Sequence, residues 1–126
     1  MRNTINSTPP HHEKLHTTTE YNGGCSVEEE SGAAIATGNY GVAVANADKA
    51  IAIVTGVLGA ATAMKEESLA LGWGMRSKVK GVLGSHIGAM YTDHEGMHIL
   101  VRKVDGVSIK ADTWYSIQNG EFRETE

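Results

Sequence analysis

The sequence is poor in the large side chains from which ordinary protein cores are built. Aromatic residues make up 6% of the 126 positions, whereas glycine alone supplies 15. The chain is 40% apolar and therefore able to bury a core, and 126 residues correspond to one ordinary domain. Because glycine and alanine concentrate between residues 32 and 90, a conventional two-layer core of large side chains is not expected there.

Cysteine, positive charge and long apolar runs are also scarce. Cys25 is the single cysteine, so no intrachain disulfide can form, and the net charge of -4 gives no general attraction to nucleic acid. No apolar segment follows Arg2, as a secretion signal would require, so we expect a cytoplasmic protein. The uncharged run 50–64 is shorter than the about 20 residues of a spanning helix, which predicts no membrane span.

What the chain does contain is a nine-residue repeat. From Gly32 the blocks read GAAIATGNY, GVAVANADK, AIAIVTGVL, GAATAMKEE, SLALGWGMR and SKVKGVLGS. The first position of each block is Gly, Ala or Ser, and the third is Ala or Val. Repeats of this length, each a short strand followed by a turn, are typical of stacked solenoids. The sequence therefore predicts an all-β fold with a parallel β-solenoid body, or β-roll.

Alternation within each strand assigns its two faces. Odd positions are small and should point into a thin roll, whereas even positions should point outward. The outward residues are large and aliphatic in every second block, which indicates an 18-residue coil of two strands with one strongly apolar outer sheet. Because water would meet this stripe in a single chain, we expect a homo-oligomer. Its predicted interface residues are Ile35, Ile51, Ile53, Leu69, Leu71 and Ile87. The alternative is that they pack inside a monomer or form a buried helix.

Two groups of proteins share features with these blocks. The segments GVAVA (41–45), AIAIV (50–54) and SLALG (68–72) resemble the strands in the heads of trimeric autotransporter adhesins. The segments SKVKGVLGSHIG (77–88) and VDGVSIKADTWYSIQNGEF (104–122) resemble uncharacterised phage and gut-bacterial proteins with SGNYS-type nonapeptide repeats. The first resemblance implies a trimer, and the second implies a phage or mobile-element origin without supplying an established chemistry.

Three regions follow from the repeat. Residues 1–31 are polar and lack the period, so we interpret them as an N-terminal arm; residues 32–90 form the solenoid. Residues 91–126 are expected to form an antiparallel β cap, with turns at 105–106 and 119–120. The residues expected to close the open end of the roll are Trp114, Tyr115 and Phe122.

Few residues suggest chemistry. The segment HEGMH (94–98) matches the HExxH zinc pattern through His94, Glu95 and His98, but its glycine favours a turn over the helix that pattern needs. His11, His12 and His16 could bind a metal at a subunit junction, but a polar arm explains them more simply. Asp48 is the only aspartate within the repeats, whereas calcium-binding nonapeptides carry one in each repeat. We therefore predict no catalytic residues, no metal and no cofactor.

The segment RSKVK (76–80) is the basic part of the solenoid, and Arg76, Lys78 and Lys80 are candidates for binding phosphate or an acidic protein; the alternative is a solvated face. Altogether the sequence predicts a non-enzymatic oligomer, preferably a trimer, that binds a host or phage macromolecule. An inhibitor of a bacterial defence system such as a CRISPR effector is one concrete form of this hypothesis. The alternatives are a structural component of a virion, tail or adhesin-like tip, and a metal hydrolase using HEGMH.

Overall fold

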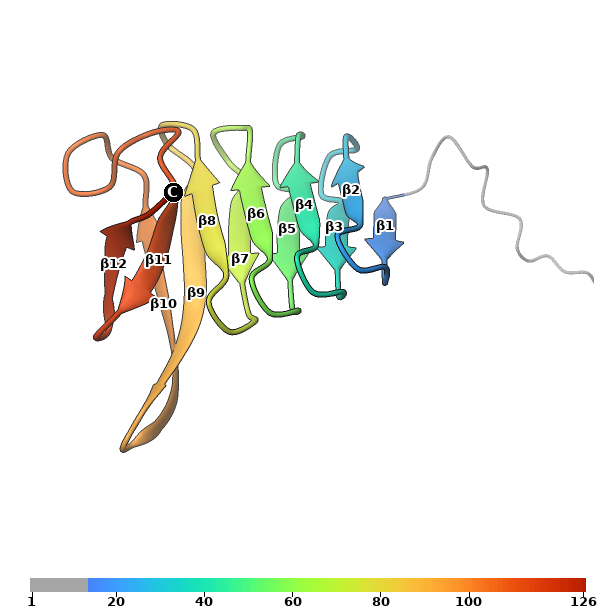
Figure 1. Cartoon of the computed structure of the whole chain (residues 1–126). Helices are drawn as coiled ribbons and strands as arrows, with labels where there is room; N and C mark the ends of the chain where they lie inside the picture. The colour runs from blue at the N-terminus through green and yellow to red at the C-terminus, as the bar shows by residue number, and fades with distance from the viewer. Residues whose placement is uncertain (1–13) are drawn as a thin grey trace, which may run out of the picture.

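The computed structural model describes residues 14–126, which form a flattened roll of two β-sheets and contain no helix (Figure 1). No part of this region forms a helix able to cross a membrane. The strands are β1 (Leu15–Thr18), β2 (Gly24–Val27), β3 (Ala33–Ala36), β4 (Val42–Ala45), β5 (Ile51–Val54), β6 (Ala60–Ala63), β7 (Leu69–Gly72), β8 (Lys78–Gly81), β9 (His86–Asp93), β10 (Gly96–Lys103), β11 (Tyr115–Gln118) and β12 (Glu121–Glu124).

From β1 to β9 the chain passes from one sheet to the other at each turn. Sheet A has the strand order β1-β3-β5-β7-β9-β10, and sheet B has the order β12-β11-β8-β6-β4-β2. Ala34, Ala52 and Ala70 lie side by side in sheet A, 18 residues apart, and all the pairs within the coils are parallel. The prediction of a parallel β-solenoid with 18-residue coils is thus confirmed.

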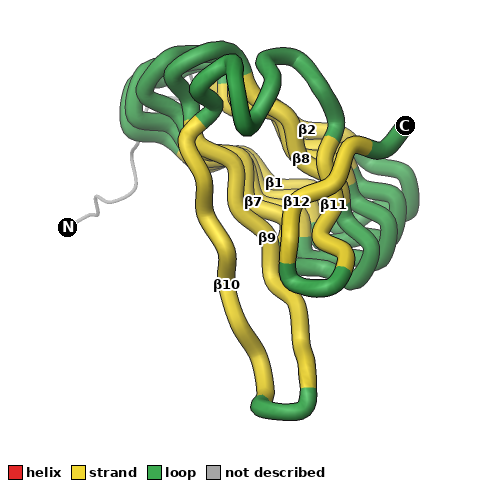
Figure 2. Tube along the Cα trace, turned by 90° about the vertical axis from the view of Figure 1, so that its left-hand side faces the viewer, coloured by secondary structure: helices red, strands yellow, loops and turns green. Residues whose placement is uncertain are grey.

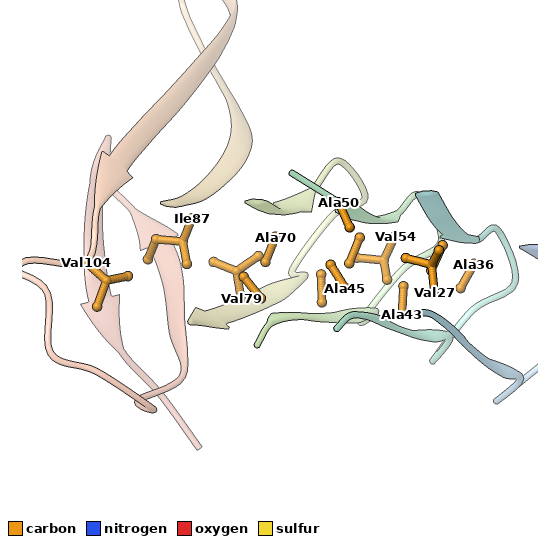
Figure 3. Close-up of a cluster of buried hydrophobic side chains, with 14 of the residues drawn as sticks. Val27, Ala36, Ala43, Ala45, Ala50, Val54, Ala70, Val79, Ile87 and Val104 are labelled. Atoms are coloured by element: carbon orange, nitrogen blue, oxygen red, sulfur yellow. The ribbon is translucent and has the colours of Figure 1, made fainter. Parts of the chain in front are cut away.

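The interior between the two sheets consists mainly of alanine. The third positions of the six blocks, including Ala43 and Ala61, are completely buried. Figure 3 shows these small side chains alternating along the roll with larger ones such as Val54, Val79 and Ile87. Small inner residues allow the two sheets to approach closely, and hydrogen bonds between successive coils satisfy the backbone.

The turns stack as regularly as the strands. A Cβ atom on Gly56 or Gly74 would collide with the carbonyl oxygen of the glycine one coil earlier, so no larger residue fits these places. Within the same turns, Tyr40, Leu58 and Arg76 adopt left-handed backbone conformations with φ of 61°, 61° and 58°. This conformation is uncommon for residues other than glycine and asparagine, and it recurs here at the spacing of one coil.

The solenoid begins earlier than the sequence predicted. Strand β1 pairs with β3 and β2 pairs with β4, so residues 14–31 form a first coil and the predicted boundary of the arm at residue 31 is wrong. The nine-residue repeat could not be recognised in this first coil, because its inward positions carry His16, Thr18 and Cys25 in place of alanine. Such side chains fit there because the end of the roll leaves them partly exposed. His11 and His12 lie outside the described residues.

Ile87 points inward, which corrects its prediction as an outward residue. It pairs with Ala70 and is completely buried. The preceding turn, 82–85, has one residue fewer than the five-residue turns before it, so His86 rather than Ile87 follows Leu69 in register. Since a one-residue shift exchanges the two faces of a strand, Ile87 becomes a core residue.

Two antiparallel hairpins complete the fold, as predicted in outline. The β9–β10 hairpin extends beyond the roll, and the β11–β12 hairpin continues sheet B (Figure 2). The predicted pairing across residues 105–106 is wrong, because β10 pairs with β9 and residues 107–114 form a loop. Tyr115 is 4% exposed and closes the end of the core with Val104 and Ile109, whereas Phe122 packs against it partly exposed.

Candidate functional site

The outer face of sheet A carries a ladder of aliphatic side chains, which we call the aliphatic ladder. Its outward positions align from coil to coil, with Ile35 beside Ile53 and Ile53 beside Leu71. The same holds for Ile51 and Leu69. Each side chain is partly buried, because it rests on the equivalent side chains of adjacent coils. The structure therefore gathers five of the six predicted interface residues on one face, and Ile87 lies beneath it.

Strand β10 extends the aliphatic ladder with residues that the sequence analysis did not assign. Val101 pairs with Gly88, and a Cβ on Gly88 would lie 3.0 Å from Val101 Cγ2 and 3.2 Å from Leu71 Cδ1. Ile99 occurs two residues earlier on the same strand face, and Ile99 and Val101 are 54% and 43% exposed. The apolar run Ile99–Val101 within HILVRKV was the available signal, but the pairing of β10 with sheet A depends on the hairpin.

The outer face of sheet B has a cavity, whereas large side chains cover the outer face of sheet A. The cavity has a volume of about 1020 Å³ and is here called the sheet B groove. Its floor contains Ala60 and Thr62 on β6, which lie between the longer residues of β4 and β8. The residues that line it are Tyr40, Val42, Val44, Leu58, Ala60, Thr62, Met64, Arg76, Lys78, Lys80, Trp114, Ser116, Ile117, Gln118, Thr125 and Glu126.

The predicted basic residues all line this groove, and Trp114 accompanies them. The ammonium groups of Lys78 and Lys80 lie 4.5 and 4.6 Å from the centroid of the Trp114 ring, within the range of cation–π attraction. Lys78 Nζ also donates a hydrogen bond of 2.9 Å to the main-chain oxygen of Glu126. Trp114 was predicted as a cap residue, but it faces the groove because its neighbour Tyr115 takes the inward position beside Val79.

One edge of the groove is formed by the left-handed turn residues. Tyr40, Leu58 and Arg76 are spaced by 18 residues and follow one another along the roll. Tyr21, one coil before, packs edge-to-face on Tyr40 with ring centroids 5.5 Å apart, and its side chain is 73% exposed. The edge therefore passes from aromatic through aliphatic to cationic character.

The segment HEGMH lies at the tip of the β9–β10 hairpin. Asp93 Oδ1 is 2.9 Å from His98 Nε2 and accepts a hydrogen bond of 2.8 Å from the Glu95 amide. These hydrogen bonds, first that of Glu95 and then that of His98, lower the pKa of Asp93. Asp93, Glu95 and His98 could together reach one ion, but His94 is not part of this cluster, and the helical geometry of an HExxH site is not formed.

A second carboxylate holds the loop that crosses between the sheets. Asp105 Oδ1 accepts hydrogen bonds from the amides of Val107, Ser108 and Ile109 at 2.8, 2.9 and 3.1 Å. These bonds, that of Val107 foremost, lower the pKa of Asp105. Further along, the amide of Lys110 donates to the hydroxyl of the buried Tyr115 at 2.7 Å. The loop is thus fixed by local polar contacts to the cap.

Comparisons of this chain with family models, curated proteins and solved structures found no match. The function must therefore be inferred from the two outer faces themselves.

Proposed function

We propose that this protein is a non-enzymatic, self-associating binding protein whose copies join through the aliphatic ladder. The observation that supports this is the continuous apolar face of sheet A, from Ile35 to Leu71 and on to Val101. Contiguous apolar surface of this kind is typical of protein interaction sites. We propose that further copies of this chain cover the aliphatic ladder, because each copy presents the same apolar face and no other protein is needed to bury it.

The contribution of assembly follows from how much of this face the chain covers by itself. Full burial of an aliphatic side chain contributes about 1.5–3 kcal/mol relative to an exposed one. The five predicted interface residues of the ladder are already partly buried. Leu15, which pairs with Ala33 at one end of sheet A, is 56% exposed, and Ile99 and Val101 at the other end are 54% and 43% exposed. The ladder therefore stabilises the single chain as well, and the exposed residues at its two ends gain most from association.

The resemblance to adhesin heads favours three copies. Size-exclusion chromatography with light scattering tests this directly: we expect a mass three times the 13.4 kDa of one chain. A folded protein that keeps the mass of one chain at every concentration up to about 100 µM would refute self-association. A stable dimer would keep the proposed face and exclude the trimer.

The binding partner is proposed to be a protein of the bacterial host or of a phage, with a defence effector as one possibility. This part rests on the resemblance to phage proteins and on the rigid, repeated outer faces. Affinity purification from phage-infected cells followed by mass spectrometry tests it. Recovery with one defence complex supports an inhibitor, recovery in purified virions supports the structural alternative, and recovery with neither contradicts both.

A further inference from the structure

The sheet B groove differs from the rest of this acidic protein in its charge. The chain carries a net charge of -4, yet three cationic side chains line the groove: Arg76, Lys78 and Lys80. The single acidic residue among those that line it, Glu126, contributes its main-chain oxygen to Lys78. The three cations come from one turn and the strand that follows, so the groove is positive in one half only.

The other half of the groove is apolar. Val42 and Val44 on β4 and Leu58 on the edge lie beside the small floor residues, away from β8. Trp114 lies at the cationic end, with both lysine ammonium groups over its ring. From β4 to β11 the groove thus passes from aliphatic to cationic and aromatic surface.

We infer that the sheet B groove binds an acidic polypeptide segment in which apolar residues adjoin two or three carboxylates. Carboxylates complement the three cations, and the apolar residues of the segment cover Val42, Val44 and Ala60. The four strands from β4 to β11 span about 14 Å at about 4.8 Å per strand, which matches about four extended residues. A polypeptide satisfies both halves, whereas a nucleic acid backbone would meet the net negative charge of the remaining surface.

This inference rests on the proposed function only in that the chain binds a protein partner. The groove is on the opposite sheet from the aliphatic ladder, so the two surfaces are tested separately. Loss of peptide binding in a variant that keeps its oligomeric mass concerns the groove alone. A monomeric wild-type protein that binds the peptide would refute the self-association and leave the groove supported.

The test uses a fluorescein-labelled hexapeptide with leucine and phenylalanine in one half and three glutamates in the other, measured by fluorescence anisotropy with the full-length chain. A peptide with glutamine in place of glutamate is the ligand control. We expect the acidic peptide to bind at least tenfold more tightly than the glutamine peptide, and the difference to shrink when salt is raised from 50 to 500 mM, as about tenfold changes in ionic strength strongly screen exposed charges.

The protein variants locate the site. Lys78→Gln with Lys80→Gln should weaken binding of the acidic peptide about tenfold or more, and Trp114→Phe should weaken it less. Lys14→Gln with Lys49→Gln removes the same charge from exposed lysines outside the groove and should leave binding unchanged. Equal losses in both double variants would show a general charge effect and overturn the inference.

Three further results would also overturn it: no binding of the acidic peptide at millimolar concentration, equal binding of the glutamine peptide, or tighter binding of a labelled single-stranded oligonucleotide of similar charge. Circular dichroism of each variant shows whether the solenoid is intact. If the lysine variant loses its fold, Arg76→Gln provides the same test from the edge of the groove.

Discussion

The outer faces of the two sheets share one scaffold and differ in what they build on it. Both use the same 18-residue coil and the same small interior. In sheet A the row Ile35, Ile53, Leu71 remains large from coil to coil, so the side chains cover one another. In sheet B the row Val44, Thr62, Lys80 becomes short in the middle, so a groove opens there. Side-chain size at a few outward positions therefore decides between a flat face and a cavity.

The largest effect is expected when the shared interior is changed. Ala52 is completely buried between the sheets, and leucine there has no room, so Ala52→Leu should lower the free energy of unfolding by about 3 kcal/mol or prevent folding. The matched change Ile53→Leu, one residue away on the outer face, should cost less than about 1 kcal/mol. Urea denaturation of the two variants measures the contrast. Equal losses would mean that the interior can expand.

The second prediction separates the two outer faces. Ile53→Asp places a carboxylate within the aliphatic ladder, which should cost the chain about 2 kcal/mol and convert the oligomer into a monomer in light scattering. Val44→Asp makes the same kind of change on sheet B and should leave the mass unchanged. If Val44→Asp dissociates the oligomer while Ile53→Asp does not, the interface is on sheet B and the proposed role of the aliphatic ladder is refuted.

The third prediction removes the difference between the faces. Ala60→Ile places a β-branched side chain between Val42 and Lys78, so that this row of sheet B has large residues in successive coils as sheet A does. The change should raise the free energy of unfolding by about 1 kcal/mol. The same side chain fills the groove and should weaken binding of the acidic hexapeptide at least tenfold. Thermal denaturation and anisotropy are the two measurements. Undiminished peptide binding would show that the groove is not the binding site.

The smallest effect concerns the loop that joins the two sheets at the cap. Hydrogen bonds from the main-chain amides of Val107, Ile109 and Ser108 lower the pKa of Asp105. The stabilisation from this carboxylate is therefore present above the unfolded pKa of about 3.9 and is lost as the pH falls through the lower folded pKa. Asp105→Asn should lower the Tm at pH 7, and this difference should shrink below about pH 4. Calorimetry at several pH values measures it. If the Tm difference between the wild type and Asp105→Asn is the same at every pH, the effect comes from side-chain shape and not from the charge of Asp105.

Much of the fold was predictable because the repeat is local. The inward alanines, the turns and the 18-residue coil follow from spacing alone, and the structure confirms them. The first coil was not predicted, because Thr18 and Cys25 replace alanine at inward positions where the end of the roll tolerates larger residues. Ile87 was misplaced because a turn shortened by one residue reverses the faces of the strand that follows.

The candidate sites divide in the same way. The aliphatic ladder could be predicted from the sequence, and so could the basic character of residues 76–80. Trp114 could not be placed beside Lys78 and Lys80, because β11 reaches β8 only after the β9–β10 hairpin and a loop that crosses from sheet A to sheet B. The addition of Ile99 and Val101 to the ladder likewise depends on how β10 folds back on β9.

By itself, the sequence determined the repeating coil, since a strand and a turn of nine residues need only local geometry and small inward side chains. Only the tertiary structure decided where the coils start, which face Ile87 takes and which side chains line the sheet B groove. These features depend on contacts between residues distant in the sequence, and on turn lengths whose effect appears only when the strands are paired.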